Sequence, residues 1–374
     1  MKSAPSVAHL TSVHKRNDPR IFLKECRSLA RNNIDVSLIV ADGNGDCVID
    51  DVKIYDVGCQ HTSRIKRAIS TGNKILRKAI EIDSDIFHIH DSELLRIGVQ
   101  LKKLGKIVIY DSHEHLPKQI RDKEYIPAII KGLVSSSIGH YELRACRQFD
   151  AVVAATDHIR DRFIENDCTS VTVKNFAIID SELPQGSPYT ELRDVCYIGS
   201  ITKLRGIVEV VESLNKVDNG VRLQLGGTFP FEETKAEVME LEGWQRVDEL
   251  GWLTKPESKE VLRKSFAGIV TLHPVNNYID ALPVKLFEYM NAGIPVIASN
   301  IPFWGSIVEE NKCGICVDPK SPQQIAEAIN YLNRNREIAK KMGDNGRKAA
   351  FHSYNWKSEE TELIKLYDGI ISKR

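Results

Sequence analysis

The chain has 374 residues, more than a single hydrophobic core usually holds, so we expect two domains. Its 51 basic and 51 acidic residues balance, which excludes a general electrostatic attraction to nucleic acid or to acidic membranes. No apolar run approaches the roughly 18 residues that span a bilayer, and the N-terminal segment lacks the long apolar stretch of a secretory signal. The eight scattered cysteines are therefore expected to be the reduced thiols of a cytoplasmic protein.

Short β-rich runs alternate with helical patterns along the whole chain. In the first half the β-rich runs are 7–13, 36–41, 86–90, 107–110, 151–155 and 171–173. In the second half they are 195–198, 223–225, 268–272 and 296–298. Helical patterns between them include 21–31, 65–80, 94–104 and 321–332. This alternation favours parallel sheets covered on both faces, and the polar segment 181–188 is typical of a linker between two doubly wound α/β domains.

Histidines and carboxylates follow two neighbouring strands of the first half. His88, His90 and Asp91 close one run, and His113 follows the next. Ligands of doubly wound sheets lie outside the carboxyl ends of the strands, so these are candidate site residues. A His-x-His pair with a carboxylate can also hold zinc, which leaves a metal-dependent hydrolase as an alternative to histidines that pack below the sheet or line a ligand site. The basic run 14–20, after the first strand, is either an acceptor-side anion site or a solvated turn.

A glycine-containing turn follows the first strand of the second half. Gly199 would let the backbone pass close to a ligand, and Lys203 and Arg205 could meet a diphosphate, because a guanidinium fork suits phosphate. Gly227 ends the next strand in a second tight turn near the same edge of the sheet. Each pattern alone is equally typical of an ordinary loop with solvated basic residues.

The most informative stretch reads YIDALPVKLFEYMNAGIPVIAS and carries acidic residues eight positions apart. Leu286, Tyr289 and Met290 recur at helical spacing, which predicts a helix that begins near Pro283. The free N–H groups of its first turn suit a phosphate or diphosphate. Glu288 lies between one and two turns into the helix, where its carboxylate could accept hydrogen bonds from ribose hydroxyls. The layout predicts a nucleotide-sugar site.

Together these segments resemble the family-4 retaining glycosyltransferases of the GT-B fold, also called group 1, over essentially the whole chain. The resemblance rests on Asp18-Pro-Arg20, Phe87–Asp91, Tyr110–Glu114, Lys174-Asn175, Tyr197–Ser200, Arg205-Gly206, Pro283–Met290 and Tyr354-Asn-Trp356. Each segment is short, but their order and spacing together are specific.

The resemblance implies two Rossmann-like, doubly wound α/β domains with a cleft between them. Residues 1–180 would bind the acceptor and residues 190–354 the nucleotide sugar, with a last helix at about 355–374 that crosses back to the first domain. The implied reaction moves a hexose-type sugar from a nucleotide diphosphate donor to a saccharide or lipid-linked saccharide acceptor, with retention of configuration. It needs neither a cofactor nor a metal ion. Relatives of this kind build bacterial surface polysaccharides.

The resemblance also implies roles for individual residues. Catalytic roles fall on His113, Lys203, Arg205 and Asp280. Donor binding falls on Gly199, Ser200, Gly227, Leu282, Val284, Lys285 and Glu288. Lys203, Arg205 and the helix amides would stabilise charge on the departing diphosphate. Glu288 would hold the ribose and Asp280 the transferred sugar, which His113 would face.

Two positions depart from the family pattern. Asp280 stands where the family has glutamate, so its carboxylate reaches one methylene less far. Ser200 stands where an arginine usually follows the glycine, and Lys203 is the candidate to supply the missing charge. These departures leave open a binding subunit of the same fold with weakened catalytic activity. The nearest alternative that is an enzyme is a nucleotide-sugar epimerase of the same architecture.

Two segments, 64–80 and 118–131, interleave lysine and arginine with isoleucine and leucine at helical spacing. Such a pattern is typical of a helix at a membrane interface, although amphipathic helices that pack on their own sheet look the same. Both segments lie in the expected acceptor domain. We therefore expect a cytoplasmic enzyme with peripheral contact to the inner face of the plasma membrane and with no nucleic-acid partner.

Overall fold

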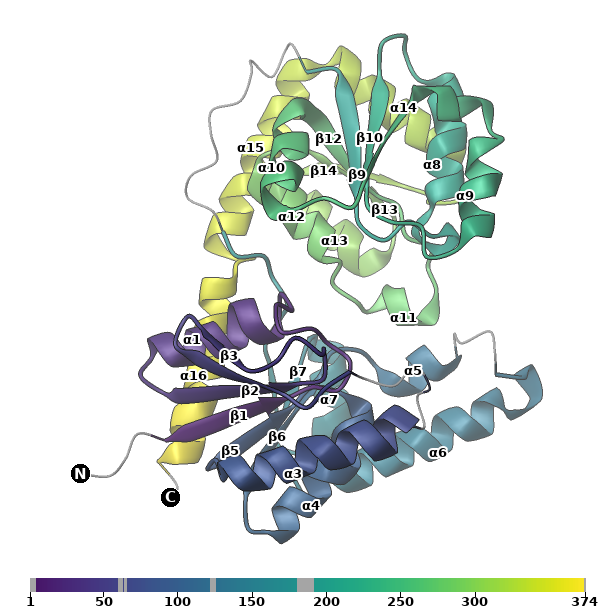
Figure 1. Ribbon diagram of the computed structural model, residues 1–374. Coiled ribbons are helices and arrows are strands. Elements are labelled where there is room, and N and C mark those ends of the chain that lie inside the picture. Colours follow the sequence, from purple (N-terminus) through teal and green to yellow (C-terminus); the bar gives the residue numbers. More distant parts are fainter. Residues whose placement is uncertain (1–4, 60–62, 64–65, 122–125, 180–191, 373–374) are drawn as a thin grey trace. The chain divides into compact units, whose positions relative to one another are not determined.

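The computed structural model describes residues 5–59, 63, 66–121, 126–179 and 192–372 (Figure 1). The chain forms two compact units: unit 1 is Met1–Asn175 with Trp356–Arg374, and unit 2 is Phe176–Asn355. The predicted class, two doubly wound α/β domains, is confirmed by one sheet of eight strands and one of six. The linker expected at 181–188 lies outside the described residues.

Unit 1 contains the eight-stranded sheet, in the order β3-β4-β2-β1-β5-β6-β7-β8. All neighbouring strands are parallel except the β3–β4 pair. Its strands are β1 (Ser6–Leu10), β2 (Asp35–Val40), β3 (Cys47–Ile49), β4 (Val52–Asp56), β5 (Ile86–Ile89), β6 (Ile107–Ser112), β7 (Ala151–Ala154) and β8 (Ser170–Thr172). The first strand is shorter than the predicted 7–13, because the Thr11 hydroxyl accepts the backbone N–H groups of Val13 and His14 and so forms a turn.

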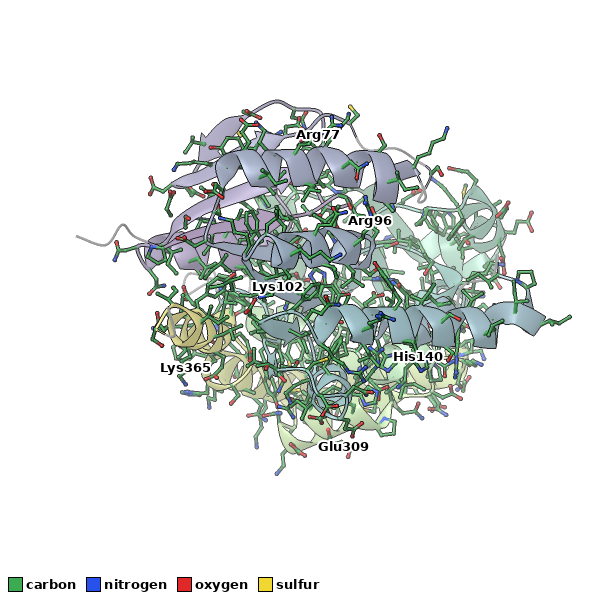
Figure 2. All side chains as sticks on the ribbon, turned by 90° about the horizontal axis from the view of Figure 1, so that it is seen from below. Arg77, Arg96, Lys102, His140, Glu309 and Lys365 are labelled. Carbon is green, nitrogen blue, oxygen red and sulfur yellow. The ribbon has the colours of Figure 1, made fainter. Side chains whose placement is uncertain are left out.

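Helices cover both faces of this sheet. One face packs against α3 (Gly72–Ile82), α4 (Leu95–Lys103), α6 (Ala128–Cys146) and α7 (Asp157–Ile164). Of these, α3, α4 and α6 lie side by side, with Arg77, Arg96 and His140 marking them in Figure 2. The other face packs against a π-helical segment (Ile21–Cys26), α1 (Arg27–Arg31) and α16 (Trp356–Ile371). The short α5 (Leu116–Arg121) follows β6 in the chain and packs against α6.

The face under α16 is the one that carries polar residues. Side chains alternate between the two faces of a strand. Val7, Ile86 and Ile109 pack in the core on the α16 side, so His9, His88 and Asp111, two residues further along each strand, lie on that same side. The helix is anchored there because the Trp356 indole donates to Ser28 Oγ at 2.9 Å and Tyr367 Oη lies 2.8 Å from His88 Nδ1.

Unit 2 contains a fully parallel sheet in the order β11-β10-β9-β12-β13-β14. Its strands are β9 (Asp194–Ile198), β10 (Arg222–Gly226), β11 (Val247–Gly251), β12 (Ser265–Val270), β13 (Val296–Ser299) and β14 (Gly314–Val317). Its helices are α8 (Ile207–Ser213), α9 (Glu232–Met239), α10 (Lys255–Lys264), α11 (Asn276–Ile279), α12 (Val284–Ala292), α13 (Pro302–Glu310), α14 (Pro322–Arg334) and α15 (Arg336–His352). The chain order reverses between β9 and β12, which is where ligands bind in doubly wound sheets.

Helix α12 begins at Val284, directly after Pro283, as the sequence predicts. The packing of α12 on the sheet depends on Tyr289, which is fully buried. Its hydroxyl accepts the backbone N–H of Ile198 at 3.1 Å. The ring lies against Gly268, where an added Cβ would be 2.4 Å from the ring. A glycine inside a strand pattern is the signal of such a close approach.

No helix among the described residues combines the length and the apolar character that crossing a bilayer requires.

Replacing Gly268 by alanine should destabilise unit 2. The added methyl would collide with the Tyr289 ring at 2.4 Å, and overpacking of this kind costs about 1–3 kcal/mol. Urea denaturation should show that loss. The control is Gly132→Ala on α6, where the new methyl meets nothing within 4 Å and a helical alanine is favoured over glycine. Equal unfolding midpoints for the two variants would contradict the proposed packing.

Candidate functional site

Two glycines shape the carboxyl edge of the unit 2 sheet. Gly199 follows β9 with φ +146°, and Gly227 follows β10 with φ +139°. The N–H of Gly199 donates to the carbonyl of Gly226 at 2.8 Å, and that of Gly227 to the carbonyl of Gly251 at 2.6 Å. A Cβ at Gly227 would lie 1.7 Å from the Gly199 oxygen. The ends of three adjacent strands are therefore joined by bare backbone, which leaves no room for side chains.

Two cationic side chains lie beside this turn. A Cβ on Gly199 would be 2.9 Å from Lys285 Cε and 3.8 Å from both Lys285 Nζ and Arg205 Nη1. Arg205 reaches this place because Gly206, with φ +75°, bends the chain close to Thr271, whose carbonyl would be 2.2 Å from an added Cβ. The arrangement places positive charge next to open backbone at the switch point of the sheet, which suits a phosphate group.

Lys203 and Ser200 have other partners. Lys203 forms an ion pair with Glu237 on α9, and its side chain is about half exposed. The Ser200 carbonyl accepts the Tyr197 hydroxyl at 3.0 Å. The cation that stands next to Gly199 together with Arg205 is thus Lys285, and the assignment of Lys203 to the diphosphate stays a prediction.

The N-terminus of α12 points its first turn toward the same edge. No described side chain caps that turn, and Pro283 is its N-cap residue. Val284 is half-buried, and Leu282 packs on the core that α12 shares with α13. Lys285, the second residue of the helix, donates to Oε2 of Glu288 at 3.1 Å, about one turn further along. This leaves Glu288 partly exposed on the helix, with a cation already beside it.

Asp280 ends the short helix α11 and is half-buried. The loop that it opens is fixed by Trp304, which is fully buried and whose indole N–H donates to the Ala281 carbonyl at 2.7 Å. Sequence reasoning missed Trp304 and Tyr289 as supports of the site. Their signal is their size within otherwise aliphatic helix faces, but their partners lie far away in sequence.

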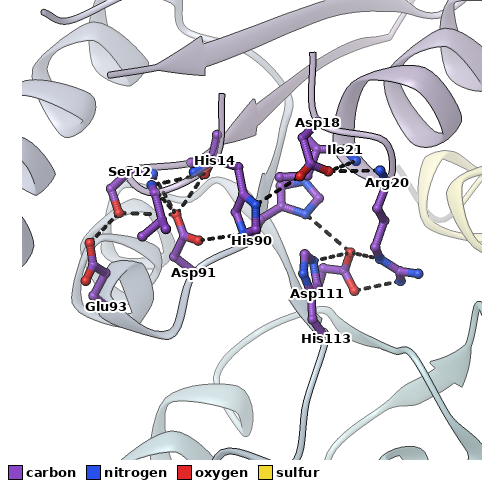
Figure 3. Close-up of polar contacts among 12 residues, drawn as sticks. Ser12, His14, Asp18, Arg20, Ile21, His90, Asp91, Glu93, Asp111 and His113 are labelled. Carbon is purple, nitrogen blue, oxygen red and sulfur yellow. Dashed lines mark hydrogen bonds and ion pairs between the residues drawn. The ribbon is translucent and has the colours of Figure 1, made fainter. Parts of the chain in front are cut away.

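In unit 1 an ion pair lies below His113. Arg20 donates to both oxygens of Asp111, with Nε at 2.7 Å from Oδ2 and Nη2 at 2.8 Å from Oδ1 (Figure 3). Its Nη1 donates to the Val173 carbonyl at 3.0 Å, and both side chains are buried. His113 Nε2 is 3.0 Å from Asp111 Oδ2.

The charge on Asp111 determines which ring nitrogen of His113 donates a hydrogen bond. Burial raises the pKa of Asp111, but the positive charge of Arg20 and the contact with His113 outweigh it and bring that pKa well below the usual range. An ionised carboxylate only accepts, so His113 donates its Nε2–H to Asp111, and in the neutral imidazole Nδ1 is then an acceptor. His113, which is partly exposed, therefore offers a hydrogen-bond acceptor to a ligand hydroxyl.

The basic run 14–20 is neutralised within unit 1. Arg16 donates to both carboxylate oxygens of Asp42, at 2.9 and 2.7 Å, and Arg20 is held by Asp111. His14 Nδ1 is 3.0 Å from Asp18 Oδ2. Burial lowers the pKa of His14, but Asp18 and Asp91 outweigh it and raise that pKa overall. Two of the cations that an anion site in this run would need, Arg16 and Arg20, are therefore already paired with carboxylates.

The histidines of unit 1 do not form the set that the hydrolase alternative requires. Asp91 accepts the N–H of Ser12 at 2.6 Å and the hydroxyl of Thr11 at 2.9 Å, so it supports the turn after β1. Among the described residues, two groups bring donor atoms close enough to hold a metal ion. One consists of His9, Glu25, His88 and His90, and the other of His90, Asp111 and His113.

Comparison with known protein families accounts for nearly the whole of this architecture. Residues 20–174 match the model of Glycosyltransferase Family 4, and residues 179–349 match that of Glycosyl transferases group 1. The chain is 27% identical over 171 residues to a GDP-mannose-dependent alpha-(1-6)-phosphatidylinositol monomannoside mannosyltransferase of Mycobacterium tuberculosis, an alignment that covers 43% of this chain and 42% of the relative. The chain spans less than half the length of the first curated relatives that it matches.

Solved structures agree on the fold. Sucrose-phosphate synthase of Thermosynechococcus elongatus superposes with a TM-score of 0.79 at 16% identity, over 99% of this chain and 100% of the other. HepE of Anabaena, solved in complex with UDP and glucose, gives a TM-score of 0.73 at 14% identity, over 98% and 100% of the two chains. The chain belongs to the group 1, family-4 glycosyltransferases, and its two units are the Rossmann-like halves of a GT-B fold.

Proposed function

We propose that this protein is a retaining glycosyltransferase that moves a hexose-type sugar from a nucleotide diphosphate donor to a saccharide or lipid-linked saccharide acceptor. The observation that carries the proposal is the turn after β9, where Gly199 leaves bare backbone next to Arg205 and Lys285. A diphosphate needs that combination of close backbone approach and cationic side chains. The mannosyltransferase relative, named as GDP-mannose-dependent, and the UDP complex of HepE support the donor class.

Unit 2 would act by stabilising the leaving group. As the bond to the sugar breaks, negative charge grows on the diphosphate, and preorganised positive groups then stabilise it more than in the ground state. Arg205, Lys285 and the N-terminal amides of α12 would supply this stabilisation, and the α12 dipole adds to it. These groups take the place that a metal ion fills in other transferases, so we propose transfer without a metal ion or a cofactor.

The remaining residues would hold the sugars. Glu288 would accept hydrogen bonds from the ribose, and Asp280 from the transferred hexose, with its loop fixed by Trp304. In unit 1, which we propose binds the acceptor, His113 would accept a hydroxyl through Nδ1. With retention of configuration, the departing phosphate would take the acceptor proton, so no separate general base is needed.

The nature of the mannosyltransferase relative favours an acceptor attached to a lipid, since its name contains a phosphatidylinositol mannoside. We therefore propose a role in bacterial surface polysaccharide synthesis, with peripheral contact to the inner face of the plasma membrane. The start of α6 is the candidate surface, because Ile129 is 96% exposed, Leu133 is 71% exposed and Ile130 lies between them. Lys131 supplies positive charge on this helix end, and Lys118 and Arg121 supply it on α5, which packs against α6.

The other basic segment fits a membrane less well. Ile75 on α3 is buried in the core, and Arg67 is held by Glu93 at 2.7 Å. Residues 64, 65 and 122–125 of the two predicted segments lie outside the described residues. The exposed apolar cluster at the start of α6 is therefore the part of the membrane prediction that the geometry supports.

Binding of nucleotide diphosphates tests the donor site. Calorimetry with UDP and GDP in EDTA-containing buffer should show binding to the wild type and a ten- to hundredfold weaker affinity for Glu288→Ala. A hydrogen bond to a charged group contributes about 1.5–3 kcal/mol, and about 1.4 kcal/mol is tenfold. Glu310→Ala, at the far end of α13, is the control. Affinity unchanged in Glu288→Ala would remove this residue from the site, and binding that requires Mg²⁺ would contradict metal independence.

Steady-state kinetics should distinguish the catalytic roles of Arg205, Lys285 and Lys203. Arg205→Ala and Lys285→Ala should each lower kcat by about 10²–10³, because removing one preorganised donor from developing charge has effects of that size. Lys203→Ala should change kcat little, since Glu237 already holds this ammonium. A loss of kcat in Lys203→Ala as large as in Arg205→Ala would show that Lys203 leaves Glu237 for the diphosphate. A rise in KM alone in Arg205→Ala would contradict the proposed role in leaving-group stabilisation.

Sedimentation with anionic vesicles tests the membrane surface. The wild type should bind at low salt and be released as ionic strength rises, because surface charges are screened beyond about 10 Å at 0.1 M salt. Ile129→Glu with Leu133→Glu should abolish binding. Ile69→Glu, at an isoleucine of the other basic segment that is 56% exposed, should not. If wild type and double variant both stay in the supernatant at low salt, the membrane role is wrong.

A further inference from the structure

Unit 1 buries a cluster of three histidines and one glutamate away from the proposed donor chemistry. His9 on β1 and His88 on β5 are direct partners in the parallel register, and His90 follows β5 on the same face. Glu25 approaches them from the π-helical segment that also begins next to Arg20. The four side chains are fully buried.

Several polar atoms in this cluster lack a hydrogen-bond partner within the described part of the chain. They are His9 Nε2, His88 Nε2, His90 Nδ1 and both carboxylate oxygens of Glu25, although His90 Nδ1 lies 3.3 Å from Asp111 Oδ2 and Glu25 Oε1 lies 3.1 Å from Arg20 Nε. Each unsatisfied buried group costs about 1–3 kcal/mol, and native proteins keep few of them. The other ring nitrogens, His9 Nδ1, His88 Nδ1 and His90 Nε2, face Glu25 Oε2, which itself has no hydrogen-bond partner among the described residues.

The distances show what fits among them. Glu25 Oε2 is 3.9 Å from His9 Nδ1, 3.8 Å from His88 Nδ1 and 3.9 Å from His90 Nε2. His9 Nδ1 and His90 Nε2 are 2.8 Å apart. A water at the centre of four partners, with hydrogen bonds of about 2.8 Å, needs those partners about 4.6 Å apart. A tetrahedral metal ion with bonds of about 2.1 Å needs ligands about 3.4 Å apart. The observed cage is too small for water and close to that of a metal ion.

We propose that His9, Glu25, His88 and His90 bind one divalent transition-metal ion. Three imidazole nitrogens and one carboxylate oxygen suit Zn²⁺ or Fe²⁺. His90 carries the outer support expected of a metal ligand, since its Nδ1 is 3.3 Å from Asp111 Oδ2. Arg20 Nε lies 2.7 Å from Asp111 Oδ2 and 3.1 Å from Glu25 Oε1, so Glu25 Oε2 is the carboxylate oxygen left to face the ion.

The ion would have a structural task. Its ligands are sealed from solvent, so no substrate reaches it. It would join β1, β5 and the segment after Arg20, and so fix the position of Arg20, Asp111 and His113. This role is independent of the proposed transfer step, whose positive charges lie in unit 2.

Metal content tests the proposal on the untagged full-length chain, expressed with added Zn²⁺, Fe²⁺ or Mn²⁺ and dialysed against EDTA. Elemental analysis should find about one ion per chain. Glu25→Gln and His88→Asn should each weaken metal binding tenfold or more, the usual minimum even for outer-sphere losses. Tyr367→Phe is the matched control, because it removes the hydroxyl that contacts His88 Nδ1 and leaves every ligand in place, so it should retain the ion.

A second measurement guards against variants that do not fold. Co²⁺ added to metal-stripped wild type should give the visible absorption bands of tetrahedral cobalt, and Zn²⁺ should displace them. Circular dichroism and urea unfolding of each variant serve as the folding control, because the substitutions lie in unit 1. Wild type without bound metal from every medium and without a cobalt spectrum would overturn the proposal. So would ion content that is equal in wild type, Glu25→Gln and His88→Asn, because the ion would then lie elsewhere.

Discussion

The contact between Gly227 and the carbonyl of Gly199 is the constraint on which the unit 2 site depends. With the two backbones this close, three strand ends form one continuous edge of bare backbone. Helix α12 can then bring Lys285 against Gly199, provided that Tyr289 packs into the space that Gly268 leaves. Positive charge and open backbone meet at the switch point because the strands allow that approach, and no single residue produces the site alone.

Unit 1 achieves the same kind of preorganisation with buried charge. Arg20 and Asp111 form a two-pronged ion pair under the sheet edge, and such a pair is costly to bury unless its hydrogen bonds are complete. Here the Val173 carbonyl and His113 complete them. The ion pair thereby makes Nε2 of His113 a donor to Asp111. In the proposed acceptor site, the orientation of this imidazole would be set by residues that do not touch the ligand.

Local patterns were enough to predict much of this protein, and long-range contacts explain what they missed. Alternating β-rich and helical runs predicted most strands, and the start of α12 followed from Pro283, because these signals are local. Strand β11 was missed because its sequence, VDELG, is mostly charged or small. Glu25 could not be placed beside the histidines, because the approach of a helical segment to two strands is not encoded in spacing. The sequence also could not show which lysine lies next to Gly199. Lys203 is instead paired with Glu237, while Lys285 lies against Gly199, and both contacts join residues that are distant in the chain.

Helix α16 is a part of unit 1 that is synthesised only after unit 2. Trp356, Leu363 and Tyr367 belong to the core on the polar face of the first sheet, yet they are made after all of unit 2. During synthesis, residues 1–175 therefore emerge with the part of this face that α16 covers still exposed, and unit 2 has every strand and helix of its own before α16 closes it. The first half of the chain to appear is thus the last to be completed, and any chaperone that protects an exposed face would be needed there for the longest time.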